Sequence, residues 1–196
     1  VDEFSKFARM PEPERRTQDL AKLVREAVIL QEDAQQEGVT VSSDIPSDEV
    51  TVDVDATMIG QALTNLIKNA GEATETLREK GAPEGYAPAI HVTGARETSE
   101  AGDPVALIRI EDNGIGLPED RARLFEPYVT TREKGTGLGL PIVKKIIEEH
   151  GGTLALEDAP AFPGCSHRGA AAVIRLPLKP ESPRQDVRDR EREAHE

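Results

Sequence analysis

One long helix with a single apolar face limits what this chain can fold into. Asp55 is suited to cap a helix whose apolar residues recur every three or four positions. The residues of this stripe are Ile59, Ala62, Leu63, Leu66, Ile67 and Ala70. An apolar stripe of this length must be buried against another layer of secondary structure. A layered fold is therefore predicted.

The flanking segments supply both helices and strands for such layers. Helical spacing predicts helices over 18–36 and 138–152. Strands are predicted at 38–45, 49–54, 89–97, 104–112, 153–158 and 170–178. The residues "PSD" at 46–48 suit a hairpin-like turn between the first two strands. Because helices and strands do not alternate strictly, we expect an α+β fold with a mixed, mostly antiparallel sheet and not a doubly wound parallel one.

Charge and composition exclude several classes of function. The net charge of −13 argues against a nucleic-acid or anionic-membrane surface, since both need clustered Lys and Arg. No apolar run approaches the roughly 18 residues of a membrane helix, so we expect no direct membrane contact and a cytoplasmic chain. The single cysteine, Cys165, excludes an internal disulfide and is expected to be an inert thiol.

A polar stripe runs beside the apolar face of the long helix. Asn65, Asn69 and Glu72 fall on it at helical spacing. A solvated helix face explains such a stripe equally well. Asparagine is nevertheless a poor helix former, and its amide oxygen is a hard, neutral ligand suited to Mg²⁺.

Two glycine-containing stretches follow. In "EDNGIGLP", 111–118, the carboxylate of Asp112 accepts hydrogen bonds directly before two glycines that let a flat ligand approach the backbone. A plain turn is the simpler explanation. In "GTGLGLP", 135–141, glycine-rich backbone opens a helix and presents N–H groups suited to a phosphate. Tight helix entry is the alternative, and the stretch matches neither the Walker nor the Rossmann pattern.

Taken in this order and at this separation, the three stretches resemble the N, G1 and G2 boxes of the GHKL (Bergerat) ATP-binding fold. "LFEPYVTT" resembles the F box of sensor histidine kinases, and "DEFSKFARMPEP" resembles a segment of nitrogen-regulation kinases of the NtrY and NtrB type. The resemblance covers residues 18–178. It implies a two-layer α/β sandwich in which helices cover one face of the sheet.

The resemblance also implies roles for individual residues. Asp112 would accept the adenine amino hydrogen, while Gly114 and Gly116 make room for the purine. Asn69 would ligate Mg²⁺, with Asn65 on the phosphate side. Arg132 and Lys134 would reach the γ-phosphate of ATP and, with Asn65, serve catalysis. The other expected nucleotide contacts are Lys68, Glu72, Ile115, Thr131, Gly135, Thr136, Gly137, Leu138, Gly139 and Leu140.

Three regions and two partners follow from the same resemblance. Residues 1–17 would end a dimerisation and phosphotransfer helix and its linker, 18–178 would form the catalytic ATP-binding domain, and 179–196 would be a charged, disordered tail. A lid at 117–135 would be mobile without nucleotide, with Phe125 and Tyr128 as apolar anchors. The partners would be the histidine-phosphotransfer domain of the same parent chain and a response regulator. The resemblance is compatible with a parent chain anchored in the bacterial inner membrane.

The histidines do not fit the phosphoacceptor motif of these kinases. His91, His167 and His195 lie in strand, loop and tail contexts, and His150 is most simply a helix-end residue before glycine. We therefore expect the phosphoaccepting histidine to lie outside this sequence.

The chain departs from the kinase pattern at Glu72, where many histidine kinases carry a lysine, so the positive charge that faces the phosphates must come from Lys68 or the lid.

Three alternative kinds of protein share these sequence boxes. A GHKL hydrolase needs a glutamate at the position of Asn65, an adapter would not need intact glycine boxes, and an anti-sigma serine kinase lacks the F box.

Overall fold

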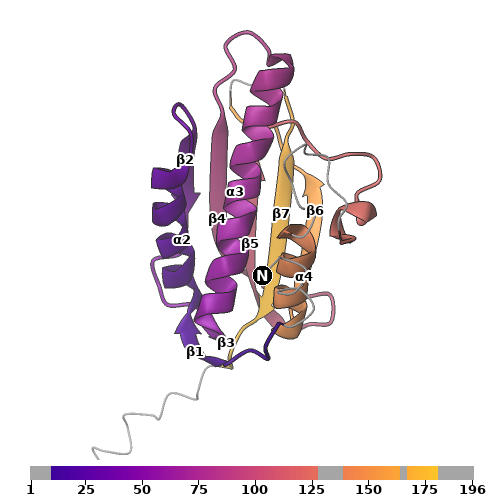
Figure 1. Cartoon of the computed structure of the whole chain (residues 1–196). Helices are drawn as coiled ribbons and strands as arrows, with labels where there is room; N and C mark the ends of the chain where they lie inside the picture. The colour runs from indigo at the N-terminus through magenta and orange to yellow at the C-terminus, as the bar shows by residue number, and fades with distance from the viewer. Residues whose placement is uncertain (1–9, 128–138, 164–166, 181–196) are drawn as a thin grey trace, which may run out of the picture.

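The computed structural model describes residues 10–127, 139–163 and 167–180. The helices α2, α3 and α4 form one layer over a five-stranded sheet (Figure 1). The expected two-layer α/β fold is confirmed. The helices span Leu20–Ala34 (α2), Ala56–Gly81 (α3) and Gly139–Glu149 (α4), with a short 3-10 helix, η1, at Ala122–Phe125. The strands are Arg16–Asp19 (β1), Thr40–Asp44 (β2), Thr51–Val54 (β3), Ala89–Thr98 (β4), Pro104–Asp112 (β5), Thr153–Asp158 (β6) and Ala170–Pro177 (β7).

The sheet is mixed and mostly antiparallel, as the sequence predicts. Its order is β2-β4-β5-β7-β6, and only the β2–β4 pair in it is parallel. The central strand β5 is paired on both sides, and Asp112 is its last residue, opposite Ile90 of β4. Asp112 therefore lies at the end of a strand that is held in place by hydrogen bonds to both neighbouring strands.

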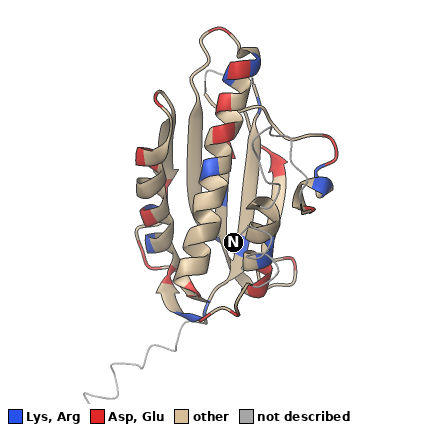
Figure 2. Ribbon diagram, viewed as in Figure 1, with Lys and Arg blue, Asp and Glu red and all other residues tan. Residues whose placement is uncertain are grey.

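The core lies between the helices and the sheet. The predicted stripe of α3 is buried, and Leu63 and Ile67 are at most 1% exposed. The charged residues of α2 and α3 lie on the helix surfaces that face away from the sheet (Figure 2). The core is aliphatic, which agrees with an aromatic content of only 3%. Further buried members from α4 and the sheet are Ile142, Val143, Ile146, Ile147, Ile90, Val92, Ile108, Ile110, Ile174 and Leu176.

The predicted hairpin between 38–45 and 49–54 is wrong. β2 pairs in parallel with β4, whereas β3 pairs antiparallel with β1 in a separate two-stranded sheet. β3 buries Val52 and Val54 below the helices, while β2 is largely exposed at the sheet edge. The two strands thus belong to different sheets, and the turn between them does not pair them. β1 was not predicted because "RTQD" has no apolar alternation.

The start of α3 is tied to the end of α4 and to the entering chain. Asp55 caps α3 by accepting hydrogen bonds from the N–H groups of Thr57 and Met58, and it also accepts from Glu14 N–H at 2.9 Å. His150, directly after α4, accepts from Asp55 N–H through Nε2 at 3.0 Å and donates through Nδ1 to the carbonyl of Ile146 at 2.7 Å. The prediction of a helix-end histidine is confirmed, and both of its ring nitrogens are used structurally.

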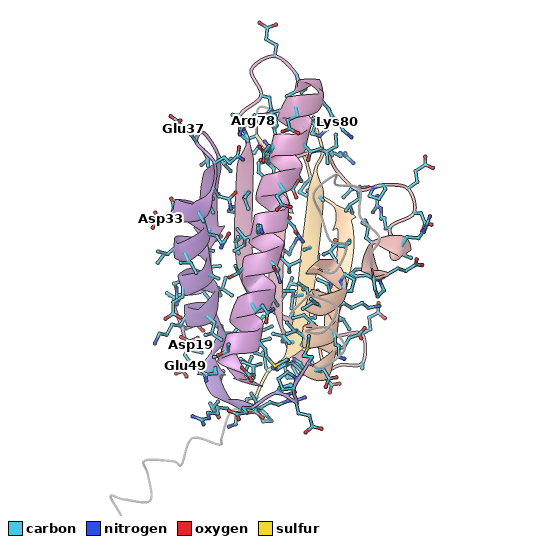
Figure 3. The ribbon with its side chains drawn as sticks, viewed as in Figure 1. Asp19, Asp33, Glu37, Glu49, Arg78 and Lys80 are labelled. Carbon is cyan, nitrogen blue, oxygen red and sulfur yellow. The ribbon has the colours of Figure 1, made fainter. Side chains whose placement is uncertain are left out.

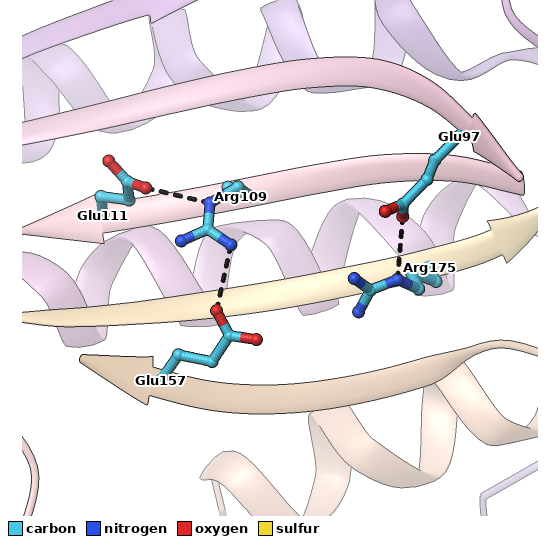
Figure 4. A network of polar contacts seen from close by, with 5 residues as sticks. All are labelled: Glu97, Arg109, Glu111, Glu157 and Arg175. Atoms are coloured by element: carbon cyan, nitrogen blue, oxygen red, sulfur yellow. Dashed lines mark hydrogen bonds and ion pairs between the residues drawn. The ribbon is translucent and has the colours of Figure 1, made fainter. Parts of the chain in front are cut away.

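The sheet face opposite the helices is covered by its own charged side chains. Arg109 of β5 donates to Glu111 at 3.0 Å and, across β7, to Glu157 of β6 at 3.1 Å (Figure 4). Burial acts to lower the pKa of Arg109, but these two carboxylates raise it above its ordinary value. The guanidinium stays charged, and Val173, the register partner of Arg109 on β7, is 0% exposed.

A second ion pair lies along the same face, where Arg175 of β7 donates to Glu97 of β4 at 3.0 Å (Figure 4). In the part of the chain that the structure describes, no helix is long and apolar enough to cross a membrane.

Candidate functional site

A cavity of about 310 Å³ lies between α3, the end of β5 and the first turn of α4. Its size and mostly apolar lining are typical of a small-molecule site. The apolar walls come from the helix stripe, the sheet and the segment after β5: Leu66, Ala70, Ala73, Ile110, Leu117, Pro118, Leu124, Leu140, Leu156, Ala170, Ala171 and Ala172. Of the residues predicted from sequence, Asn69, Asp112, Ile115, Gly116 and Leu140 line this cavity.

Asp112 is the buried acid of the site, with only 5% of its surface exposed. Its Oδ1 accepts from Gly114 N–H at 2.8 Å and from Ala170 N–H at 3.4 Å. Gly169 packs against it so closely that a Cβ there would lie 2.0 Å from the Asp112 carbonyl oxygen. These two bonds fix the orientation of the carboxylate.

The two glycines of the turn after β5 differ in what they do. A Cβ on Gly114 would lie 2.4 Å from the carbonyl carbon of Ala73, so this glycine lets the turn pack against α3. Ile115 N–H donates to the Ala73 carbonyl at 3.0 Å in the same contact. Gly116 lines the cavity and has a φ of +84°, which favours glycine. The space that Gly114 was expected to leave for a purine is thus occupied by α3, whereas Gly116 does line the cavity.

The polar stripe of α3 is only partly turned toward the cavity. Asn69 lines it, while Asn65, Lys68 and Glu72 do not. Lys68 and Glu72 form an exposed ion pair at 4.0 Å, with the lysine side chain 67% exposed. Such a pair contributes little to stability, so Lys68 is available to exchange partners.

The cavity has a second polar end that sequence reasoning missed. Thr76 and Lys80 line it, one and two turns beyond Ala73 on α3. Lys80 lies near the C-terminal end of that helix (Figure 3). The Thr76 hydroxyl donates to the Glu72 carbonyl at 2.9 Å. Both residues continue the spacing of Asn69 along the helix, and that periodicity is the signal that could have identified them.

Asn113 and His167 were also missed as parts of the site. Asn113, 3% exposed, turns away from the cavity: its Oδ1 accepts from Ala89 N–H at 2.9 Å and from the Tyr86 hydroxyl at 3.1 Å. His167, from the β6–β7 loop, bonds through Nε2 to the Gly114 carbonyl at 2.5 Å. Both contacts join segments far apart in sequence, so no local pattern reveals them.

The beginning of the predicted lid is partly described. η1 lies within it, and Phe125 packs against the main core as expected, with Lys144 Nζ 5.0 Å from its ring centre. Gly139 is the first residue of α4, and apart from its neighbours in the chain no described residue lies within 4 Å of a Cβ added there. The remaining predicted residues lie outside the described part of the chain: Tyr128, Thr131, Arg132, Lys134, Gly135, Thr136, Gly137 and Leu138. Cys165 and His195 do so as well.

Known proteins give this geometry a family. The nitrogen regulation protein NtrY of Azorhizobium caulinodans is 46% identical over 190 residues, which are 96% of this chain and 22% of that protein. An NtrY-like putative sensor histidine kinase of Rickettsia felis is 33% identical, over 91% of this chain and 27% of that protein. The chain thus spans about a quarter of the length of these curated relatives.

Solved structures agree. The catalytic domain of histidine kinase ThkA, in a nucleotide-free form, superposes with a TM-score of 0.66 at 29% identity, covering 85% of this chain and 99% of that one. The sequence profile of the histidine kinase-, DNA gyrase B- and HSP90-like ATPases matches residues 54–180, which hold the whole cavity. This chain belongs to the family of histidine kinase-, DNA gyrase B- and HSP90-like ATPases.

Proposed function

We propose that this chain is the catalytic ATP-binding domain of a two-component sensor histidine kinase. In the proposed reaction, the γ-phosphoryl group of ATP passes to a histidine on a phosphotransfer domain of the same parent protein, and then to an aspartate of a response regulator. The observation that carries the proposal is that buried Asp112 and Asn69 both line one cavity, in a fold shared with kinase catalytic domains.

Asp112 supports adenine as the base. Adenine carries an amino group where guanine carries a carbonyl oxygen, so only adenine can donate to the carboxylate. An unmatched acceptor facing a buried carboxylate costs about 1–3 kcal/mol. The flat apolar walls around Ile110, Leu156 and the alanines of β7 suit a purine ring.

Mg²⁺ is proposed as the companion of ATP. Within the described residues, no cluster of three or more His, Cys, Asp or Glu side chains could hold a metal ion. The amide oxygen of Asn69 fits instead the usual magnesium arrangement, in which one or two protein oxygens act together with the phosphates of the substrate. When bound, the ion would neutralise phosphate charge during transfer.

The protein's remaining tasks in phosphoryl transfer are positioning and charge neutralisation. We propose that Arg132, Lys134 and the backbone at 135–139 face the phosphates, with Lys68 as a further cation. Asn65 cannot accept a proton from water, so efficient ATP hydrolysis is not part of the proposal. The relatives' greater length supports a phosphotransfer domain elsewhere in the parent protein.

The test is transfer of label from γ-labelled ATP to a separately supplied helical domain that bears the phosphoaccepting histidine. We expect acid-labile label on that domain, at a low rate because the effective concentration given by a covalent link is missing. The chain incubated alone should remain unlabelled. Stoichiometric acid-labile label on this chain, or rapid phosphate release without transfer, would contradict the proposal.

A further inference from the structure

We propose that His167 is a positioning residue of the adenine pocket, and this inference rests on the proposed function. His167 belongs to the loop between β6 and β7, distant in sequence from the turn after β5. Its Nε2 lies 2.5 Å from the carbonyl oxygen of Gly114, two residues after the carboxylate that would read the base. The side chain therefore acts on the pocket through the turn and not by touching the base.

Apart from the bonds of Asn113 to Tyr86 and Ala89, the turn is held at three points, each with a different origin. Gly114 N–H donates to Asp112 Oδ1 at 2.8 Å, which links the turn to the carboxylate itself. Ile115 N–H donates to the Ala73 carbonyl at 3.0 Å, which links it to α3. His167 supplies the third point, through its hydrogen bond to the Gly114 carbonyl. It is the one among these three holds that a side-chain substitution removes without changing Asp112.

Gly114 connects the carboxylate proposed to read the base to the cavity wall. Its N–H donates to Asp112, its carbonyl is held by His167, and the next residues, Ile115 and Gly116, line the cavity. Because the peptide between Gly114 and Ile115 is planar, a rotation that moves the Gly114 carbonyl also moves the N–H of Ile115, which donates to α3. Loss of the imidazole should therefore loosen the contact with α3 directly. The N–H that donates to Asp112 belongs to the preceding peptide, so the orientation of Asp112 should be loosened through the backbone torsions of Gly114.

The chemistry of the contact indicates which substitution should preserve it. A carbonyl oxygen only accepts hydrogen bonds, so the Nε2 atom of His167 must carry the hydrogen. The side-chain amide of glutamine carries its N–H at nearly the same distance from the backbone. His167→Gln should therefore keep the contact, whereas His167→Ala removes it.

The experiment is titration calorimetry of the chain with Mg-ATP and with Mg-ITP, whose base carries an oxygen in place of the adenine amino group. For His167→Ala we expect about tenfold weaker ATP binding and a change of less than about threefold for ITP. His167→Gln should return ATP affinity to within about threefold of the wild type. The matched control is His91→Ala, which removes a histidine hydrogen bond to Ser42 Oγ at 2.7 Å on the sheet edge and should leave both affinities unchanged.

Three results would overturn the inference: unchanged ATP affinity in His167→Ala, equal losses for ATP and ITP, or no recovery in a folded His167→Gln. If the alanine variant fails to fold, as shown by thermal melting, His167→Leu, which fills the space but has no donor, takes its place and should show the same selective loss of ATP affinity. A wild-type chain that binds no ATP would instead overturn the proposed function, and the inference with it.

Discussion

At Gly169 one added carbon would collide with Asp112, the residue that we propose reads the base. A Cβ at this position would lie 2.0 Å from the carbonyl oxygen of Asp112 and 2.7 Å from its Oδ1. Both contacts are far below van der Waals separation, and backbone cannot yield as a flexible side chain does. The glycine is therefore part of what holds the carboxylate in place.

Gly169→Ala is expected to lower the free energy of unfolding by about 1–3 kcal/mol, the usual cost of overpacking, and to weaken ATP binding. Urea unfolding and calorimetry measure the two effects. The control is Gly60→Ala on α3, where no atom lies within 4 Å of the added carbon and a gain of about 0.5–1 kcal/mol is expected. Equal stability of the two variants would refute the packing argument.

Asn69 is the residue that we connect with the metal. Asn69→Ala should remove the gain in ATP affinity that Mg²⁺ gives, about tenfold, and leave binding in the presence of a chelator unchanged, because the contact proposed between Asn69 and the nucleotide runs through the metal. Calorimetry with and without Mg²⁺ separates these terms. Gln61→Ala, an exposed amide on the same helix, serves as the control. An equal loss with and without metal would assign Asn69 a structural role.

Site residues that are identified by their residue type and local periodicity could be predicted from sequence. Site residues that are brought to the pocket by long-range packing could not. Asp112 and Asn69 lie on the cavity wall because an acid ending a strand and an amide on an amphipathic helix are fixed by local periodicity. His167 reaches Gly114 only through the fold, across 53 positions of sequence. The reason for Gly114 likewise depends on the backbone of α3.

Among the elements, α3 is the one on which both the core and the site depend, and its first turn carries a charge-dependent cap. Desolvation acts to raise the pKa of Asp55, but the N–H donors of Glu14, Met58 and Thr57, with nearby His150, lower it below its ordinary value. The ionised form is thus favoured in the folded state. Its contribution to stability is present above the unfolded pKa, near 4, and is lost as pH falls through the lower folded pKa.

Asp55→Ala is expected to cost about 1 kcal/mol or more of unfolding free energy at pH 7, in line with the loss of an N-cap. The deficit relative to wild type should begin to shrink below about pH 4, where the carboxylate of the unfolded chain becomes protonated, and should shrink further as pH falls through the lower folded pKa. Asp55→Asn keeps a capping oxygen and should lose less. Urea unfolding at pH 7, 5 and 3.5 measures this, and a deficit that does not change with pH would count against the charged cap.

Elements with a strong period were predictable, and pairings between them were less so. α3 is buried where its stripe indicates, and β4, β5 and β7 lie where apolar alternation predicts them. The assumed hairpin failed because chain proximity was taken for pairing, although β2 is exposed and β3 is buried. Register is set by which face is buried, and that becomes known only when the layers are assembled.

For the whole molecule, the difficulty is that a chain with a net charge of −13 is proposed to bind a polyanion. Exposed charges more than about 8–10 Å apart are screened at physiological salt, so net charge matters less than the groups in contact with the ligand. Lys80 lines the cavity itself, and Lys68 directly precedes the cavity residue Asn69 on α3. Selectivity is then expected to come from the base, through Asp112.

Binding of Mg-ATP to the wild type and to Asp112→Asn, measured by titration calorimetry, tests this central claim most directly. Asparagine keeps the size of the side chain but loses the charge, and a hydrogen bond to a charged group contributes about 1.5–3 kcal/mol. We predict that the variant binds ATP about ten- to a hundredfold more weakly, while Asp103→Asn in the exposed β4–β5 turn binds like the wild type. Unchanged ATP affinity in a folded Asp112→Asn variant would contradict the account.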